Sequence, residues 1–137
     1  MSEKHFVRSE NVSTQQLDWG TIKWMSKPGV TDAERFSAGV VFLQPGKGHD
    51  LHTHPDSEEV LYIISGEGEQ TVAGDTREVG QGDMIHIPAD VEHGTQNTGW
   101  EPLKFLAIYS PPGPEEEVGA LPECEILPPG ELPVREE

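Results

Sequence analysis

The spacing of turn residues is the feature that most constrains what this chain can fold into. Over residues 21–110 the apolar runs are only a few residues long, and Gly, Pro, Asp or Asn separates them. No window shows the 3.6-residue periodicity of an amphipathic helix, whereas short runs bounded by turn residues are typical of strands. With 15 Gly and 12 Pro in 137 residues, the pattern predicts an all-β domain, a sandwich or a barrel.

The chain divides into three expected parts. Residues 1–20 are polar and are expected to form a loosely structured N-terminal segment, and residues 21–110 are expected to form the β domain. Residues 111–137 hold seven of the twelve prolines and are rich in glutamate, which predicts a Pro/Glu-rich C-terminal tail. The expected strands follow one another as in a meander: 21–25, 35–44, 50–54, 59–65, 69–73, 76–79, 84–87, 93–98 and 103–110.

Charge and hydropathy exclude several classes of partner. Nine Lys and Arg against 25 Asp and Glu give a net charge of −16, which repels nucleic-acid phosphates and anionic lipids. The longest aliphatic or aromatic run, Val60 to Ile64, is far shorter than the roughly 20 residues of a membrane span. The N-terminus lacks the apolar core of a signal peptide, and the lone Cys124 has no cysteine to pair with. We therefore expect a cytoplasmic protein without nucleic-acid or membrane partners.

Histidines are concentrated where the chain can carry chemistry, since five of the six lie between positions 49 and 93. His52 and His54 are two residues apart in an expected strand and therefore point to the same side. Glu59 opens the next strand, and His93 follows a turn about forty residues later. Three imidazoles and a carboxylate, with no thiolate, suit one divalent first-row transition metal per chain: Mn, Fe, Ni, Co or Zn.

These residues stand in two spaced motifs. The first is Gly, five residues, His-x-His, four residues, Glu, six residues, Gly, and the second is Gly, five residues, Pro, four residues, His, three residues, Asn. With these motifs the chain resembles the small single-domain bacterial cupins of the RmlC-like, type-2 kind. Asp90 departs from the pattern, because a turn glycine is usual there, but Asp also adopts left-handed backbone angles. The matching residues are Gly46, His52, His54, Glu59, Gly66, Gly82, Pro88, His93 and Asn97.

The resemblance covers roughly Arg35 to Tyr109 and carries expectations for fold and function. It implies a cupin jelly-roll, an antiparallel β-barrel, with the metal on His52, His54, Glu59 and His93. Isomerases, decarboxylases and dioxygenases of the family use such a site. A metalloenzyme acting on a small polar metabolite, such as a sugar or organic acid, is therefore expected. The alternative is a non-catalytic small-molecule or metal-binding regulatory module.

The site leaves alternatives open at single residues. Glu58 competes with Glu59 as the carboxylate ligand, although strand parity favours Glu59. The candidates for a catalytic acid or base are Glu58, His49, His86 and Tyr62, and none of them is singled out. The histidines could also be a hydrogen-bonded cluster without a metal.

One expected strand is apolar on both faces. Val60, Tyr62 and Ile64 alternate with Glu59, Leu61 and Ile63, and a barrel interior accounts for only one of the two sets. The other set needs cover from the tail, from the N-terminal segment or from a second copy of the chain. We expect the second copy, and hence a homodimer.

Overall fold

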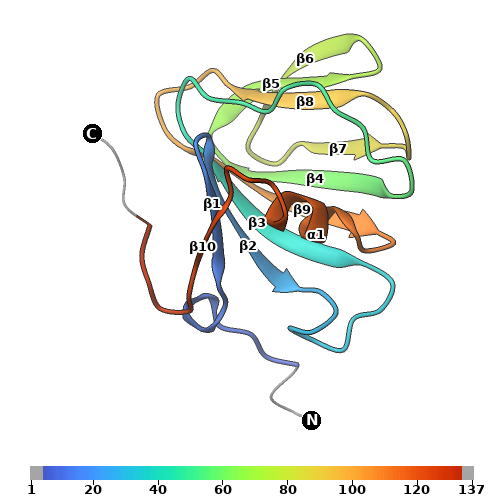
Figure 1. The fold of residues 1–137 in the computed structure, drawn as a ribbon. Helices are drawn as coiled ribbons and strands as arrows, with labels where there is room; N and C mark the ends of the chain where they lie inside the picture. The colour runs from blue at the N-terminus through green and yellow to red at the C-terminus, as the bar shows by residue number, and fades with distance from the viewer. Residues whose placement is uncertain (1–4, 134–137) are drawn as a thin grey trace.

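The chain forms two antiparallel sheets, one above the other in Figure 1, in a computed structural model that describes residues 5–133. The outer ends of the two terminal segments, 1–4 and 134–137, lie outside the described residues. The larger sheet has the order β10-β1-β2-β3-β9-β4-β7, and the smaller one β6-β5-β8. The strands are β1 (Thr14–Leu17), β2 (Gly20–Ser26), β3 (Ser37–Leu43), β4 (Glu58–Ser65), β5 (Glu67–Val72), β6 (Asp75–Gly80), β7 (Met84–Ile87), β8 (His93–Asn97), β9 (Leu103–Ser110) and β10 (Glu125–Leu127).

The all-β prediction is confirmed. Over residues 5–133 the helical segments are a short 3₁₀ turn, η2 (Ser9–Asn11), and one helix, α1 (Pro114–Gly119). Neither is long and apolar enough to cross a membrane. The strands of the β domain lie within a few residues of their expected positions, with one exception. The expected strand 50–54 is wrong: this segment meets β8 only through single bridges, Gly48 to Gln96 and His52 to His93.

The expected meander is also wrong. Strand β9 lies between β3 and β4, far from both in sequence, and pairs with each along most of its length. The reason is that β9 is apolar on both faces, so a central position buries more of its surface than an edge position does. The two histidine-bearing regions of the chain are joined separately, by the single bridges between the segment before β4 and strand β8.

Both terminal segments contribute strands to the larger sheet. Strand β1 lies in the segment expected to be loosely structured, and it pairs with β2 on one side. Strand β10, from the C-terminal tail, pairs with β1 on the other side, with Thr14 opposite Leu127. Leu17 and Leu127 are buried there. Their burial holds the two terminal segments on the larger sheet, although the composition of these segments alone indicates little structure.

The core lies between the sheets and follows strand alternation. In β3 and β9 every second residue over most of the strand is buried, and the residues between them are only partly buried. Because successive side chains point to opposite faces, one set lines the interior. The buried cluster consists of Leu17, Trp19, Ile22, Trp24, Val41, Leu43, Leu61, Ile63, Ile87, Leu103, Phe105 and Ala107.

Motif residues that carry no metal chemistry hold turns. Asp90 has φ of 62°, which confirms that it takes the left-handed conformation in place of a glycine. Gly66 has φ of 91°, and a Cβ there would lie 2.7 Å from the carbonyl oxygen of Pro102. The Asn97 side chain donates to the carbonyl oxygens of Leu43 (2.8 Å) and Glu101 (2.9 Å). Asp90 and Asn97 fix how β8 enters and leaves the smaller sheet, and Gly66 forms the turn between β4 and β5.

We expect Leu103→Ala to lower the free energy of unfolding by about 2–5 kcal/mol, because Leu103 is fully buried and the truncation leaves a cavity. Leu132→Ala is the matched control, since Leu132 is 85% exposed, and its effect should stay within about 0.5 kcal/mol. Denaturant unfolding followed by tryptophan fluorescence measures both. Equal effects of the two variants would contradict the position of the core.

Candidate metal centre

Three histidines from two distant parts of the chain meet between the sheets. His52 and His54 lie on the irregular segment before β4, and His93 is the first residue of β8. One ring nitrogen from each lies within 4.8 Å of the corresponding nitrogen of the other two. The His-x-His spacing therefore does place both side chains on one side, as expected. The His52–His93 bridge, with backbone hydrogen bonds of 2.9 and 3.0 Å, joins the two segments at the site.

Backbone carbonyls orient two of these rings. Nδ1 of His52 lies 2.7 Å from the carbonyl oxygen of Asp50, and Nδ1 of His93 lies 2.8 Å from that of Val91. A neutral ring that donates from Nδ1 keeps a lone pair on Nε2. The Nε2 atoms of both rings can thus act as ligands when they carry no proton, and the rings are held by the main chain in the way that metal-bound histidines commonly are.

Several buried polar atoms at this point have no hydrogen-bond partner outside the group itself. They are both ring nitrogens of His54, Nε2 of His93 and Oε1 of Glu59. Glu59 lies on β4 and is only 4% exposed, and its Oε1 is 3.0 Å from Nε2 of His93. Such atoms are costly to bury unpaired. Imidazole nitrogens and a carboxylate oxygen are ligand types of divalent transition metals, so the donor set fits such an ion.

The protonation of the histidines favours ligand lone pairs. Burial lowers the pKa of His52 and of His54, so both rings are neutral at neutral pH. For His93, burial acts in the same direction, but the Glu59 carboxylate and the Val91 carbonyl outweigh it and raise the pKa. His93 and Glu59 therefore form the pair in which a proton competes with a metal ion for the same atoms.

A cavity of about 260 Å³ opens beside the histidines. Its wall is mainly apolar and aromatic and comes from β1, β2, β3, β4 and β9. The polar groups gather at one part of the wall, where the three histidines and Glu59 lie. The lining residues also include Trp19, Trp24, Thr95, Tyr109, Glu117 and Val118.

The four candidates for a catalytic acid or base occupy different surroundings. His49 lines the cavity, with its ring 4.1 Å from that of Trp19. Burial and the neighbouring histidines lower its pKa to about 3, so the ring is neutral. Glu58 and His86 form an exposed pair at 2.8 Å outside the cavity. Tyr62 lies on the same outer face of β4 as Glu58 and also does not line the cavity.

His49 reaches the cavity because its segment is irregular. In a regular strand, residues 49 and 52 point to opposite faces, since their separation is odd. Here His49 bonds through its backbone N–H to Thr95 (2.9 Å), and His52 bonds to His93 (2.9 Å). The chain between these contacts leaves the strand conformation. Three histidines of the segment can therefore face the same space.

Two cavity residues were missed by the sequence reasoning. Tyr109 stands opposite Glu59 in the β4–β9 register, and its ring lies 5.2 Å from that of His54. Burial, followed by the charge of Glu59, raises the pKa of Tyr109 well above its ordinary value. Glu117 lies on α1, with Oε2 3.7 Å from Nδ1 of His54. Inward parity on β9 could have indicated Tyr109, but nothing in the tail sequence indicates Glu117.

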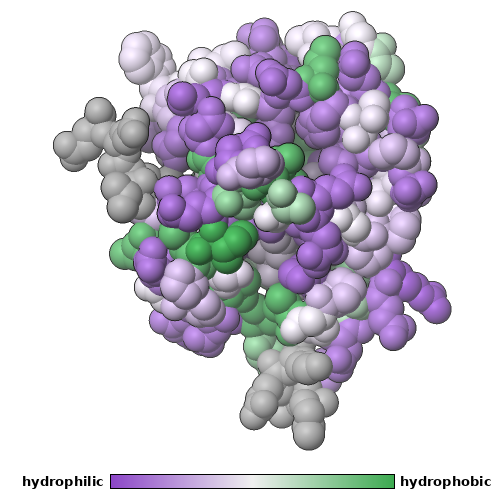
Figure 2. Space-filling view, in the orientation of Figure 1, coloured by the Kyte–Doolittle hydropathy of each residue, from purple (hydrophilic) through white to green (hydrophobic). Residues whose placement is uncertain are grey.

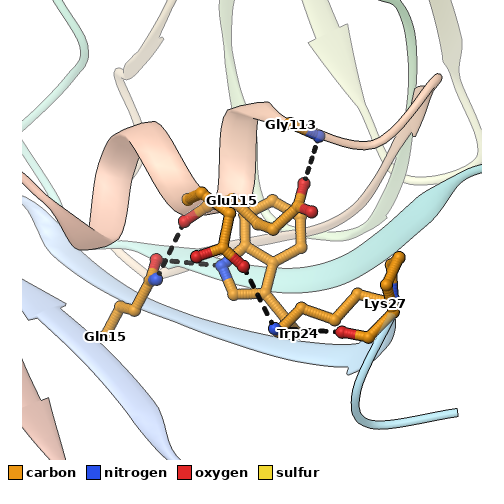
Figure 3. A network of polar contacts seen from close by, with 7 residues as sticks. Gln15, Trp24, Lys27, Gly113 and Glu115 are labelled. Atoms are coloured by element: carbon orange, nitrogen blue, oxygen red, sulfur yellow. Dashed lines mark hydrogen bonds and ion pairs between the residues drawn. The ribbon is translucent and has the colours of Figure 1, made fainter.

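A polar network anchors α1 against β1 and β2, as Figure 3 shows. The indole N–H of Trp24 donates to Oε1 of Gln15 (2.9 Å), and Nε2 of Gln15 donates to the carbonyl oxygen of Glu115 (3.1 Å). The buried Glu115 carboxylate accepts from the backbone N–H of Gly113 at 2.9 Å. The tail therefore has a defined position at the cavity.

Comparison with known proteins identifies the family. The cupin domain profile matches residues 39–109, and this chain belongs to the cupin family. It is 33% identical over 104 residues to the uncharacterized protein MJ1618 of Methanocaldococcus jannaschii, covering 76% of this chain and 83% of that one. It is 28% identical to the polyketide synthase CurC of Streptomyces cyaneus, covering 73% of this chain and 65% of CurC. Identity to the oxalate decarboxylase OxdC of Bacillus subtilis is 35%, and the match spans 56% of this chain but only 21% of OxdC.

Solved structures share the fold. KdgF from Halomonas sp. superposes with a TM-score of 0.71 over 81% of this chain and 96% of KdgF, at 18% identity. An RmlC-like cupin from Shewanella frigidimarina gives 0.70 over 82% of this chain and 95% of that one, also at 18% identity. The expected cupin jelly-roll is thus confirmed. Proteins of this family typically bind a divalent metal, and the histidine triad is in place here.

We expect purified protein to hold about one divalent transition metal per chain, measured by elemental analysis. His93→Ala should lower metal retention at least about tenfold, because it removes a buried ligand atom from the group. His86→Ala is the matched control, since that exposed ring pairs with Glu58 outside the cavity. Metal retention that is the same in both variants would contradict the position of the centre.

Proposed function

We propose that this protein is a mononuclear metal-dependent enzyme acting on a small molecule, with His52, His54, Glu59 and His93 as the ligands. The observation that carries the proposal is the group of buried nitrogen and oxygen atoms that faces a cavity and has no hydrogen-bond partner outside the group. A divalent ion held there would act as a Lewis acid toward substrate oxygens. Four protein ligands leave coordination positions available on an ion that prefers six.

The chain's own groups bind and orient the substrate. Tyr109 stays protonated at neutral pH, because burial and Glu59 raise its pKa, and its hydroxyl can donate a hydrogen bond. The Glu117 carboxylate lies near His54 at the cavity, with Oε2 3.7 Å from Nδ1, and can accept a proton there. Trp19 packs against His49 and keeps water from one side of the histidine group. These roles make Tyr109 and Glu117 stronger candidates for proton transfer than Glu58, His86 or Tyr62.

The relatives support an enzyme, with different reactions among them. OxdC is an oxalate decarboxylase, and a glucose-6-phosphate isomerase of Thermococcus kodakarensis is 43% identical over 68 residues. That match spans 46% of this chain and 35% of the isomerase. Decarboxylation next to a carbonyl group and isomerisation through an enediolate both place negative charge on a substrate oxygen, which a bound divalent metal would stabilise. Because both reactions require this stabilisation, the relatives favour metal-stabilised reactions of this class but do not single out one reaction.

We expect turnover in a panel of organic acids, sugars, 1,3-diketones and phenolic compounds to stop when the metal is chelated. Glu59→Gln should reduce this turnover on the order of a hundredfold, since a neutral amide is a weaker ligand than a carboxylate. Glu58→Gln is the control and should have little effect, because Glu58 lies outside the cavity. Metal-dependent binding without turnover, measured by calorimetry with the ligand recovered unchanged, would favour the alternative of a binding module.

We propose further that two copies pair through the outer face of β3, β9 and β4. Apolar side chains stand in register there, with Val40 opposite Leu106, Leu106 opposite Tyr62, and Ile108 opposite Val60. The N-terminal segment covers only the neighbouring β2, where Nζ of Lys23 donates to the carbonyl oxygens of Ser9 and Val12. The central strip remains partly exposed. An uncharged strip on a chain with a net charge of −16 suits an identical partner better than a charged one.

We expect light scattering to give a mass near twice the 15.1 kDa of one chain. Tyr62→Lys should shift the protein toward monomer, because it buries a charge at the centre of the strip. Trp100→Lys is the control, since Trp100 is 94% exposed and lies on the loop between β8 and β9. A wild-type mass of a single chain would contradict the pairing.

A further inference from the structure

The side chains of the cavity wall indicate which kind of molecule fits the cavity, whereas the metal ligands do not. Ile22, Val41, Leu61 and Phe105 contribute apolar surface from four different strands, and the indole rings of Trp19 and Trp24 add aromatic surface. These side chains belong to the buried core, so the wall is held in place by packing. A molecule that fills this space exchanges water for apolar contact over most of its surface.

The wall contains no cationic side chain from residues 5–133, although the chain has lysines and arginines on several strands. Lys23 binds carbonyl oxygens of the N-terminal segment, and Lys27 reaches Glu116 at 3.4 Å. Arg77 pairs with Asp75, and Lys104 lies over the Phe42 ring at 5.3 Å. Phosphate and carboxylate groups are ordinarily recognised by arginine or lysine. No such group is available here for a second anionic end of a substrate.

The charges at the site also disfavour a second anionic group on the ligand. Two carboxylates, Glu59 and Glu117, line the cavity, and together they balance the charge of one divalent ion. The surrounding chain is strongly acidic, with a net charge of −16. A doubly charged ligand would enter a region without compensating positive charge, and its desolvation would be unfavourable.

We propose that the cavity takes a small molecule with a mainly apolar, ring-sized body and at most one negative charge, located at the end that faces the histidines. This inference rests on the proposed function for the metal-facing end and on the cavity wall for the body. It differs from the expectation of a sugar or other polar metabolite. It also separates this chain from relatives such as oxalate decarboxylase and glucose-6-phosphate isomerase, whose named substrates carry two negative charges.

The C-terminal tail completes this wall. Val118 on α1 and Leu121 just after it line the cavity, and the network around Gln15 holds α1 in position (Figure 3). Figure 2 shows apolar side chains gathered on this face around the C-terminal segment, whereas the region of β5 and β6 is mostly hydrophilic. The tail therefore acts as a specificity element that contacts the body of the ligand.

The test compares two probes that share a 2-oxo acid head and differ in the body: phenylpyruvate, with an apolar ring, and 2-oxoglutarate, with a second carboxylate. Binding to the full chain is measured by calorimetry and by quenching of tryptophan fluorescence, with metal-loaded and with metal-free protein. We expect phenylpyruvate to bind at least about tenfold more tightly. Equal affinity, tighter binding of 2-oxoglutarate or no binding of phenylpyruvate would overturn the inference.

Leu121→Arg tests the wall directly, because it replaces apolar surface by a cation at a partly exposed position. We expect weaker binding of phenylpyruvate and tighter binding of 2-oxoglutarate. The ratio of the two affinities should therefore fall at least about tenfold. Leu132→Arg adds the same charge to the tail outside the cavity and should leave the preference unchanged. If Leu121→Arg left the ratio of the two affinities unchanged, the tail would not contact the ligand, and its role in specificity would be overturned.

The outcome separates this inference from the proposed function. Since the discrimination comes from the wall, it should persist in weaker form in metal-free protein. Protein that retains no metal after loading but still prefers phenylpyruvate would contradict the proposed function and support the inference. Metal-dependent turnover of a dicarboxylate or a sugar phosphate would support the proposed function and contradict the inference.

Discussion

The gathering of buried imidazole and carboxylate groups at one point is the constraint on which the rest of this structure depends. Each unpaired buried polar atom costs about 1–3 kcal/mol. The ring nitrogens of His54 have no hydrogen-bond partner, and Nε2 of His93 and Oε1 of Glu59 have only each other, at 3.0 Å. A divalent metal ion would take one ligand atom from each of these three residues. The architecture is arranged for this meeting, since β4 belongs to the larger sheet, β8 belongs to the smaller one, and the irregular segment before β4 bridges them at His52.

Mostly apolar side chains surround the three histidines and Glu59. Side chains of the core continue into the cavity wall, so a ligand that reaches the histidines is removed from water on most sides. In such a setting electrostatic interactions are stronger than in solvent. The tail helix α1 takes part in the same arrangement, because it brings Glu117 to His54 and Val118 to the wall. The proposed substrate preference therefore rests in part on a segment outside residues 39–109, the range that matches the cupin domain profile.

Sequence reasoning succeeded where short-range rules apply. Strand bounds agreed at residues 84–87 and 103–110. His52 and His54 do lie on one side as expected, although their segment is not the strand on which that expectation rested. Asp90 takes the left-handed backbone angle expected of it. Reasoning failed where the backbone leaves regular geometry, because the alternation rule then no longer holds. His49 reaches the cavity for this reason, and Glu58, His86 and Tyr62 are separated from it by ordinary strand alternation.

The sequence by itself determined the types of ligand, their local spacing and the all-β character of the chain, because these follow from contacts between residues close along the backbone. Only the tertiary structure decided which side chains surround the metal group. Tyr109 stands opposite Glu59 through the register of β4 and β9, and Glu117 meets His54 through the packing of a tail whose composition indicates little order. Such pairings depend on which apolar faces bury one another across many residues of intervening chain, and no local pattern encodes that choice.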